Sequence, residues 1–191
     1  MIFSTFGLFR QRLLLTKFLD KISTDKTALF WGKKHPKRRK LAHILRLPLL
    51  NLEDGFLRSV GLGVSGYPPY SIVYDDLGIY YDTTRPSRLE QLILAADTMP
   101  SETLAQARQA MDFILRHHLS KYNHAPELSD NHPLRSPSKP ETVLIIDQTF
   151  GDMAIQYGGA DASTFELMFQ TALNENPQAD IWVKTHPDVL C

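Results

Sequence analysis

The chain has 191 residues, of which 43% are hydrophobic and 22% charged, and its 21 Lys and Arg balance its 21 Asp and Glu. This size and composition suit one good core or two small ones, and zero net charge excludes a general electrostatic attraction to nucleic acid. The single cysteine, Cys191, excludes an intramolecular disulfide framework and fits a reducing compartment such as the cytoplasm.

The first 21 residues are apolar, but their pattern does not predict a signal peptide. They lack a basic start and a small-residue cleavage site, and Arg10 and Arg12 interrupt them, so a membrane span is not expected either. We expect an amphipathic segment tucked against the fold. The alternative is an anchor at a membrane surface.

The residues that follow predict alternating strands and helices. Ala28–Gly32 is a short apolar run that ends in glycine, and Leu47–Glu53 is a second buried-looking strand. Between them, Pro36–Leu47 has an apolar face at helical spacing, opposite its basic residues: Leu41, Ile44 and Leu45. Ser71–Asp82 alternates β-branched and aromatic residues around Asp75-Asp76-Leu77-Gly78 and predicts a hairpin or two adjoining strands. The order indicates an α/β fold.

Two helices and a linker complete the first half. One helix is expected after Pro86, and Ser101 is expected to cap a longer one that runs to Asn123. The longer helix has an apolar face, formed by Leu104, Ala107, Met111, Ile114, Leu115 and Leu119. Residues 123–141 contain four prolines and few apolar residues, which predicts a linker between an N-terminal domain, 1–122, and the start of a second domain, 142–191.

The second half predicts a single βαβ unit. Thr142–Asp147 is a strand, Gln148–Ala160 a glycine-punctuated loop, Ser163–Pro177 a helix stopped by its proline, and Asp180–Pro187 another strand. Two strands and one helix leave one face and both edges of the sheet uncovered. We therefore expect the second domain to be incomplete.

Polar residues concentrate where predicted strands end, which is where α/β folds bind ligands. The four stretches are Glu53-Asp54-Gly55 with Arg58, Asp75-Asp76, Gln148 to Asp152, and Lys184 with His186. Each is weak alone, because Asp beside Gly favours tight turns and a His-Pro pair usually just ends a strand. We assign Asp75-Asp76 to a turn, and His35-Pro36 and His132-Pro133 to structural roles. His117-His118 has no partner at ligand spacing, so no metal site is predicted.

Lys33–Lys40 is a run of basic residues with two interpretations. It is either the solvated start of a helix or a patch that meets an anionic acceptor or a lipid surface. No aromatic residue interleaves the run, so nucleic acid is not expected as a partner.

Taken together and in order, the motifs resemble capsule polysaccharide biosynthesis proteins of the KpsC/LipA type. They are "LEDGFLRSVGLG", "PPYSIVYDDLGIYYD" with "PSRLEQLI", "LSKYN", "VLIIDQTFGDMAIQYGGA" and "NENPQADIWVKTHPDV", and the likeness runs from about Trp31 to Val189. The resemblance implies a GT-B-like enzyme with two Rossmann-like domains that transfers Kdo, a keto-sugar acid, from CMP-Kdo to a phosphatidylglycerol-linked Kdo acceptor, as a retaining β-Kdo glycosyltransferase. It also implies a location at the cytoplasmic face of the inner membrane, capsule assembly and export proteins as partners, and no cofactor.

The resemblance implies roles for individual residues. Asp152 matches the nucleophile that forms a covalent intermediate, with Asp147 as the fallback, and Glu53 would be the acid/base that takes the acceptor proton, with Asp54 as second choice. The other residues would bind substrate: His186 and Lys184 the CMP phosphate, Gln148 the donor or nucleophile, and Arg58 a sugar carboxylate or phosphate. Gln148 could equally be a strand-end amide that caps the loop.

The resemblance covers only the front part of one transferase module, so Cys191 is expected to be a break within a domain. Two hypotheses remain open: a transferase whose sequence continues further, or an inactive remnant or acceptor-binding module of such an enzyme. In both cases we expect the 191-residue chain alone to show no transferase activity. A third interpretation is a phosphatase or hydrolase that uses Asp and His. The sequence shows neither a metal-site pattern nor a nucleophile elbow to support it.

Overall fold

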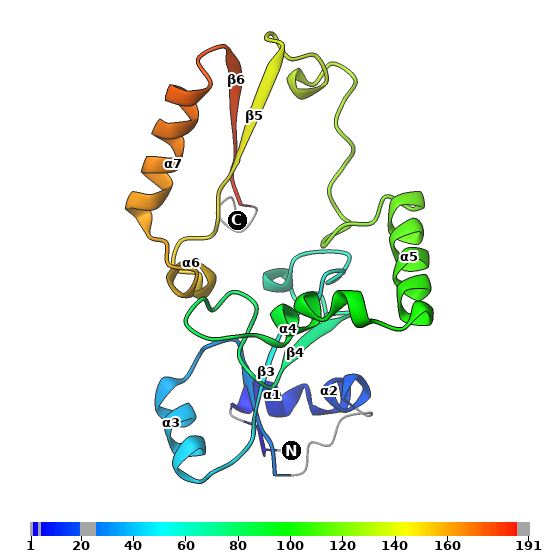
Figure 1. The fold of residues 1–191 in the computed structure, drawn as a ribbon, viewed down its shortest axis with the longest axis vertical. Coiled ribbons are helices and arrows are strands. Elements are labelled where there is room, and N and C mark those ends of the chain that lie inside the picture. Colours follow the sequence, from blue (N-terminus) through cyan, green and yellow to red (C-terminus); the bar gives the residue numbers. More distant parts are fainter. Residues whose placement is uncertain (1, 4, 20–25, 187–191) are drawn as a thin grey trace. The chain divides into compact units, whose positions relative to one another are not determined.

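The computed structural model describes residues 2–3, 5–19 and 26–186. The chain divides into two compact units, residues 1–124 and residues 125–191, called unit 1 and unit 2 below (Figure 1). Pro187 and Cys191, which enter the sequence predictions, lie outside the described residues.

Unit 1 contains a four-stranded sheet in the order β1-β2-β3-β4. The strands β1 (Ile2–Phe3), β2 (Ala28–Trp31) and β3 (Leu49–Asp54) are parallel, and β4 (Ile72–Asp75) runs antiparallel to β3. Parallel neighbours need a crossover connection, and the helices between these strands supply it. The α/β class predicted from the sequence is therefore confirmed.

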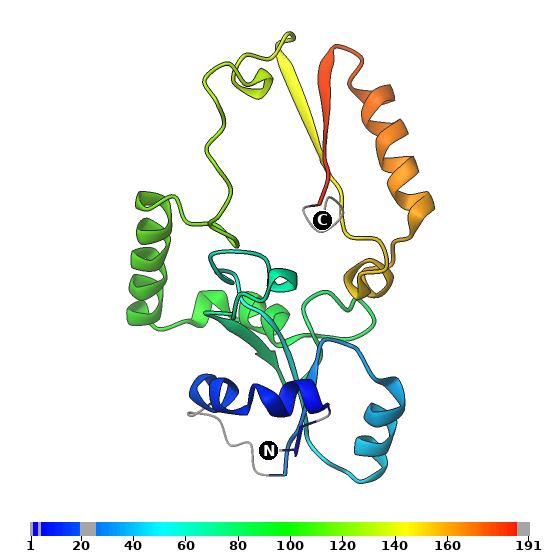
Figure 2. The ribbon, with the colours of Figure 1, turned by 180° about the vertical axis from the view of Figure 1, so that it is seen from behind.

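Helices pack on both faces of this sheet (Figures 1 and 2). On one face, α1 (Phe6–Arg10) and α2 (Arg12–Phe18) form a buried cluster with β2 and β3, made of Leu8, Leu15, Leu19, Leu29, Leu50 and Leu52. On the other face, Ala42 of α3 (Pro36–Ile44) packs against Ala28 and Phe30. Each buried leucine contributes roughly 1.5–3 kcal/mol. The N-terminal segment is thus tucked into the core, as expected.

The apolar face predicted on α3 is not the face that packs. Leu41, Ile44 and Leu45 are 55%, 64% and 59% exposed. The inward side instead carries Arg39, whose guanidinium lies 4.4 Å from the centre of the Phe30 ring and donates to an oxygen of a buried asparagine on β3. A long basic side chain can cover apolar surface with its stem, so its inward position leaves the leucines outside.

The predicted hairpin at Ser71–Asp82 is wrong, because β4 pairs with β3 and residues 79–82 form no strand. The buried carboxylate of Asp75 accepts three backbone N–H groups, from Leu77 at 2.8 Å, Gly78 at 2.7 Å and Arg88 at 2.8 Å. The Asp75 side chain thus satisfies backbone N–H groups that a paired strand would otherwise satisfy. The chain continues to α4 (Arg88–Leu94) instead of returning as a strand.

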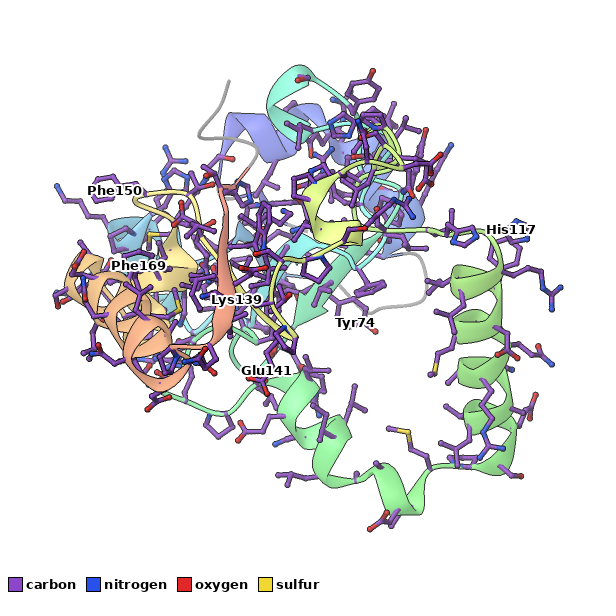
Figure 3. All side chains as sticks on the ribbon, turned by 90° about the horizontal axis from the view of Figure 1, so that it is seen from above. Tyr74, His117, Lys139, Glu141, Phe150 and Phe169 are labelled. Carbon is purple, nitrogen blue, oxygen red and sulfur yellow. The ribbon has the colours of Figure 1, made fainter. Side chains whose placement is uncertain are left out.

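The first helix after β4 begins after Pro86 as predicted, whereas the second begins differently. Ser87 caps α4 in a capping box with Glu90, whereas Ser101 is the first residue of α5 (Ser101–Arg116) and not its cap. The helix α5 ends at Arg116, earlier than predicted, and none of its residues is buried (Figure 3). The apolar face expected there is consequently not packed into a core. The described residues also include three short 3-10 helices, Gly63–Ser65, Ala96–Thr98 and Pro133–Arg135.

Unit 2 contains two parallel strands, β5 (Glu141–Ile146) and β6 (Ala179–Lys184), with the helix α7 (Ala162–Glu175) between them in sequence. The loop predicted before α7 includes a short helix, α6 (Met153–Tyr157). Side chains alternate along β5: Ile145 is buried, whereas Leu144 and Ile146 are 47% and 59% exposed. The uncovered sheet face expected from the sequence is present.

Candidate functional site

Both units place polar residues at the carboxyl ends of parallel strands. In unit 1, β3 ends with Glu53 and Asp54, and successive residues of a strand point to opposite faces of the sheet. The two carboxylates that the sequence offered as alternatives for one role therefore have different surroundings.

Asp54 lies on the face that carries α1 and borders a pocket of about 340 Å³. The buried guanidinium of Arg58 lines the same pocket and donates to Asp54 Oδ1 at 3.1 Å, to Ser59 Oγ at 2.8 Å and to the Tyr67 carbonyl at 2.5 Å. Arg58 was predicted only as a ligand-binding residue. It also holds the loop after β3 in place, because three groups of that region bond to it.

Glu53 lies on the other face, beside Gly32 and Tyr81. A Cβ at Gly32 would come within 2.7 Å of Tyr81 Oη and 3.0 Å of Glu53 Oε2, so the absence of a side chain there lets these groups approach the end of β2. Burial, and then the charge of Glu53, raise the pKa of Tyr81 to about 12. The phenol also accepts the N–H of Lys33 at 3.1 Å. Sequence reasoning missed Tyr81, whose only signal was an aromatic residue in a segment interpreted as a hairpin.

Lys34 and His35 also line the pocket of Asp54 and Arg58; the sequence suggested them only as part of the basic run Lys33–Lys40, as one of its two interpretations. His35 has left-handed backbone angles, φ 63° and ψ 59°, at the start of α3. Such angles are uncommon for a residue other than glycine and cost about 1 kcal/mol or more, and they cluster at functional sites. The pocket combines two cations, Lys34 and Arg58, with one carboxylate, so it suits an anionic ligand that also bears hydroxyl groups.

In unit 2, Asp147, Gln148 and Asp152 line one pocket of about 480 Å³, together with the apolar side chains of Phe150, Ile155 and Phe165. Asp152 is exposed and caps α6, because its carboxylate accepts the N–H of Ala154 at 2.8 Å. Phe150 is 90% exposed at the rim (Figure 3). The structure thus brings together the predicted nucleophile, its fallback and the predicted orienting amide, beside apolar surface.

His186 is tied to the same loop, since its Nδ1 lies 2.8 Å from Thr149 Oγ1. The N–H of Asp147 donates to the carbonyl of Lys184 at 3.0 Å, so the ends of β5 and β6 are also joined through the backbone. The Lys184 side chain is exposed and does not line the pocket. Thr149 is a positioning residue that the sequence did not reveal, because a threonine between Gln148 and Phe150 carries no signal by itself.

Asp75 and Asp76 form a turn, as predicted. Arg88 donates to both carboxylate oxygens of Asp76 at 2.9 and 2.7 Å, and these hydrogen bonds lower the pKa of Asp76. Among the described residues, no group of three or more His, Cys, Asp or Glu side chains is arranged to hold a metal ion. In that same part of the chain, no helix has the length and apolar character needed to cross a membrane.

Comparison with known proteins points to one family. A family model described as "Capsule polysaccharide biosynthesis protein" matches residues 26–191. The capsule polysaccharide modification protein LipA of Neisseria meningitidis serogroup B is 86% identical over 163 residues, which are 84% of this chain and 23% of LipA. The lipopolysaccharide-processing protein LpsZ of Rhizobium meliloti is 38% identical over 171 residues, covering 87% of this chain and 38% of LpsZ. The chain thus spans less than half the length of either relative.

Two solved structures of KpsC proteins are also similar to this chain. KpsC of Thermosulfurimonas dismutans, described as a beta Kdo 2,4 transferase, superposes with a TM-score of 0.86 at 41% identity, covering 97% of this chain and 60% of that one. A second KpsC structure from the same organism, a beta Kdo 2,7 transferase, has a TM-score of 0.60 at 24% identity, covering 98% and 62%, and supports the fold alone. From the match over residues 26–191 and the identity to LipA, the chain belongs to the capsule polysaccharide biosynthesis protein family.

Proposed function

We propose that the chain is part of a retaining β-Kdo glycosyltransferase of the GT-B type that moves Kdo from CMP-Kdo onto a lipid-linked Kdo acceptor during capsule biosynthesis. The observation that carries the proposal is the pocket formed by the loop after β5 and by α6 and the start of α7. It combines Asp152, Asp147 and Gln148, while Thr149 holds His186 on the same loop. The likeness to a β-Kdo transferase at 41% identity supports the choice of sugar.

In the proposed first step, a carboxylate oxygen of Asp152 attacks the anomeric carbon of Kdo. The bond from that carbon to the phosphate oxygen breaks, and CMP leaves with the electron pair. Negative charge builds on the departing phosphate, so a cation and a hydrogen-bond donor near it stabilise the transition state. We assign these roles to Lys184 and His186, and we assign Gln148 to orienting the donor.

In the second step, the acceptor hydroxyl attacks the anomeric carbon, the bond to Asp152 breaks, and Glu53 takes the hydroxyl proton. The proposed acceptor site spans the end of β3: Lys34 and Arg58, in the pocket on one face of the sheet, pair with the carboxylates of Kdo, and the hydroxyl reaches Glu53 on the other face. Unit 1 is then the acceptor side and unit 2 the donor side. The proposed chemistry uses no resident cofactor, because the carboxylates supply both the nucleophile and the base.

The experiment uses the complete encoded protein, CMP-Kdo and an acceptor that ends in β-Kdo. We expect Asp152→Asn to lower turnover about a thousandfold or more, and Asp147→Asn, its matched control from the same pocket, to have a much smaller effect. Glu53→Gln should slow the second step, so that mass spectrometry detects a Kdo adduct on Asp152. Asp54→Asn is the control for that variant. Full activity of Asp152→Asn, or an adduct on another residue, would refute the assigned mechanism.

A further inference from the structure

The outward face of α3 combines apolar and basic side chains, and the proposed function does not use it. Leu41 and Ile44 are 55% and 64% exposed on this face, and Lys37 and Lys40 each lie four positions before one of them, on the same side of the helix. Ala42 marks the opposite, buried side. Apolar side chains exposed beside lysines in this way form a docking surface and not a packed core.

The charge around this face is of one sign. No Asp or Glu occurs from Lys33 to Leu52, although that stretch holds seven of the 21 Lys and Arg of a chain with no net charge. Within the part of the chain that the structure describes, neither Lys37 nor Lys40 forms an ion pair. Lys33 of this stretch is paired with Asp82, but Lys37 and Lys40 present positive charge that no ion pair among the described residues neutralises, and an anionic partner with an apolar layer beneath its charges would complement them.

We propose that α3 docks on the surface of a bilayer that contains anionic phospholipid, with Leu41, Ile44 and Leu45 entering the headgroup boundary and Lys37 and Lys40 contacting the phosphates. At nine residues, α3 is about 13 Å long, so it lies on a membrane and does not span it. A nucleic acid would match the charge but not the exposed aliphatic side chains, which cannot stack on bases.

The helix α3 lies directly beside the pocket proposed for the acceptor. Lys34 and His35, directly before α3, line the pocket proposed for the acceptor. A bilayer that holds α3 would thus present a lipid-linked sugar beside the entrance of that pocket. This consequence rests on the proposed function, whereas the docking itself does not.

The test is co-sedimentation of the 191-residue chain with vesicles of phosphatidylcholine alone or mixed with phosphatidylglycerol. We expect binding to the mixed vesicles only, weakened by added salt. Lys37→Gln with Lys40→Gln should lower the partition coefficient about 25-fold, since each basic residue near an anionic surface contributes about fivefold. Leu41→Ser with Ile44→Ser should lower it by about tenfold or more.

Matched controls come from α5, which has exposed residues of both kinds, namely Arg108, Arg116, Met111 and Leu115. Replacing its two arginines by Gln, or the other two residues by Ser, should leave vesicle binding unchanged, and circular dichroism checks that every variant folds. Equal binding to both vesicle types, or equal losses in the α3 and α5 variants, would overturn the proposal. So would self-association of the chain that the Leu41 and Ile44 substitutions abolish while vesicle binding persists.

A transfer assay on the complete encoded protein separates this inference from the proposed function. With a lipid-free Kdo acceptor, the α3 variants should keep wild-type turnover, while with the acceptor embedded in anionic vesicles they should lose it. If wild type transfers Kdo to neither acceptor but the chain still binds vesicles through α3, the proposed function fails and the docking stands. If transfer occurs and α3 has no effect on vesicle binding, the docking fails alone.

Discussion

The Arg58 side chain joins the end of β3 to the loop that follows it, and its removal should destabilise unit 1. The side chain is only 10% exposed and donates three hydrogen bonds, to Asp54, to the Ser59 hydroxyl and to the Tyr67 carbonyl. The Asp54 side chain is 22% exposed, so its carboxylate can regain water when the guanidinium is lost. The Ser59 hydroxyl is buried and has less access to such compensation.

We estimate the loss from these contacts. The bonds to Ser59 and to the Tyr67 carbonyl contribute about 1 kcal/mol each, and the screened contact with Asp54 adds about 1 kcal/mol, so Arg58→Ala should lower the free energy of unfolding by about 3 kcal/mol. Arg58→Lys keeps the charge but cannot reproduce the planar fork. It should lower the free energy of unfolding by about half as much.

Urea unfolding followed by tryptophan fluorescence measures the effect in unit 1 alone. The chain has two tryptophans, Trp31 in unit 1 and Trp182 in unit 2, so a Trp182→Phe background leaves one reporter. With a slope of about 2 kcal/mol per molar urea, Arg58→Ala should shift the midpoint by about 1.5 M. Arg108→Ala, at an exposed position of α5, should change the free energy of unfolding by less than about 0.5 kcal/mol. The reasoning is wrong if the two alanine variants unfold at the same urea concentration.

Three further predictions concern polar side chains held by hydrogen bonds. Asp75→Asn replaces a carboxylate that accepts three backbone N–H groups, so the free energy of unfolding should fall by about 2–3 kcal/mol in the same assay, and an unchanged midpoint would contradict this. Because burial and the charge of Glu53 raise the pKa of Tyr81 to about 12, its stabilising contribution should be complete below about pH 10 and be lost as pH rises toward 12. In Tyr81→Phe, the urea midpoint should fall less steeply between about pH 10 and pH 12 than in the wild type. Parallel plots of midpoint against pH for the two proteins would contradict this prediction. In the complete encoded protein, Thr149→Val should raise the KM for the proposed donor, CMP-Kdo, about tenfold through the lost contact with His186, whereas Thr149→Ser should not, and equal effects would exclude this positioning role.

Most strands and most helices could be predicted from local patterns, although β1 was not. Apolar runs bounded by glycine or proline marked β2, β3, β5 and β6. In β2 and β3 the run is continuous because both faces of a parallel sheet are buried, whereas one face of β5 is uncovered. The same patterns placed Asp152 and the Lys184–His186 segment after strand ends, where parallel strands bring their carboxyl termini to one edge. The match to a capsule polysaccharide biosynthesis family was also carried by the order of these motifs.

The contacts of each residue were decided by the tertiary structure. Helical spacing indicated an apolar face on α3, but Arg39 packs on Phe30 and turns that face outward. The sequence of β3 suggested Glu53 and Asp54 as alternatives for one role. Because the strand is pleated, they point to opposite faces: Glu53 lies near Tyr81, and Asp54 accepts a hydrogen bond from Arg58.

The sequence by itself determined most of the segments that form strands and helices, and therefore which residues stand at the ends of β3, β5 and β6, but it missed β1 and α6 and wrongly predicted a strand after β4. Local periodicity predicts that a segment has an apolar and a polar face. The residues that pack against each face come from distant parts of the sequence, so periodicity does not identify them. Thr149 with His186, and Asp75 with the start of α4, are such pairings. Only folding brings them within hydrogen-bond distance, which is why the tertiary structure and not the motif decides how the site is held.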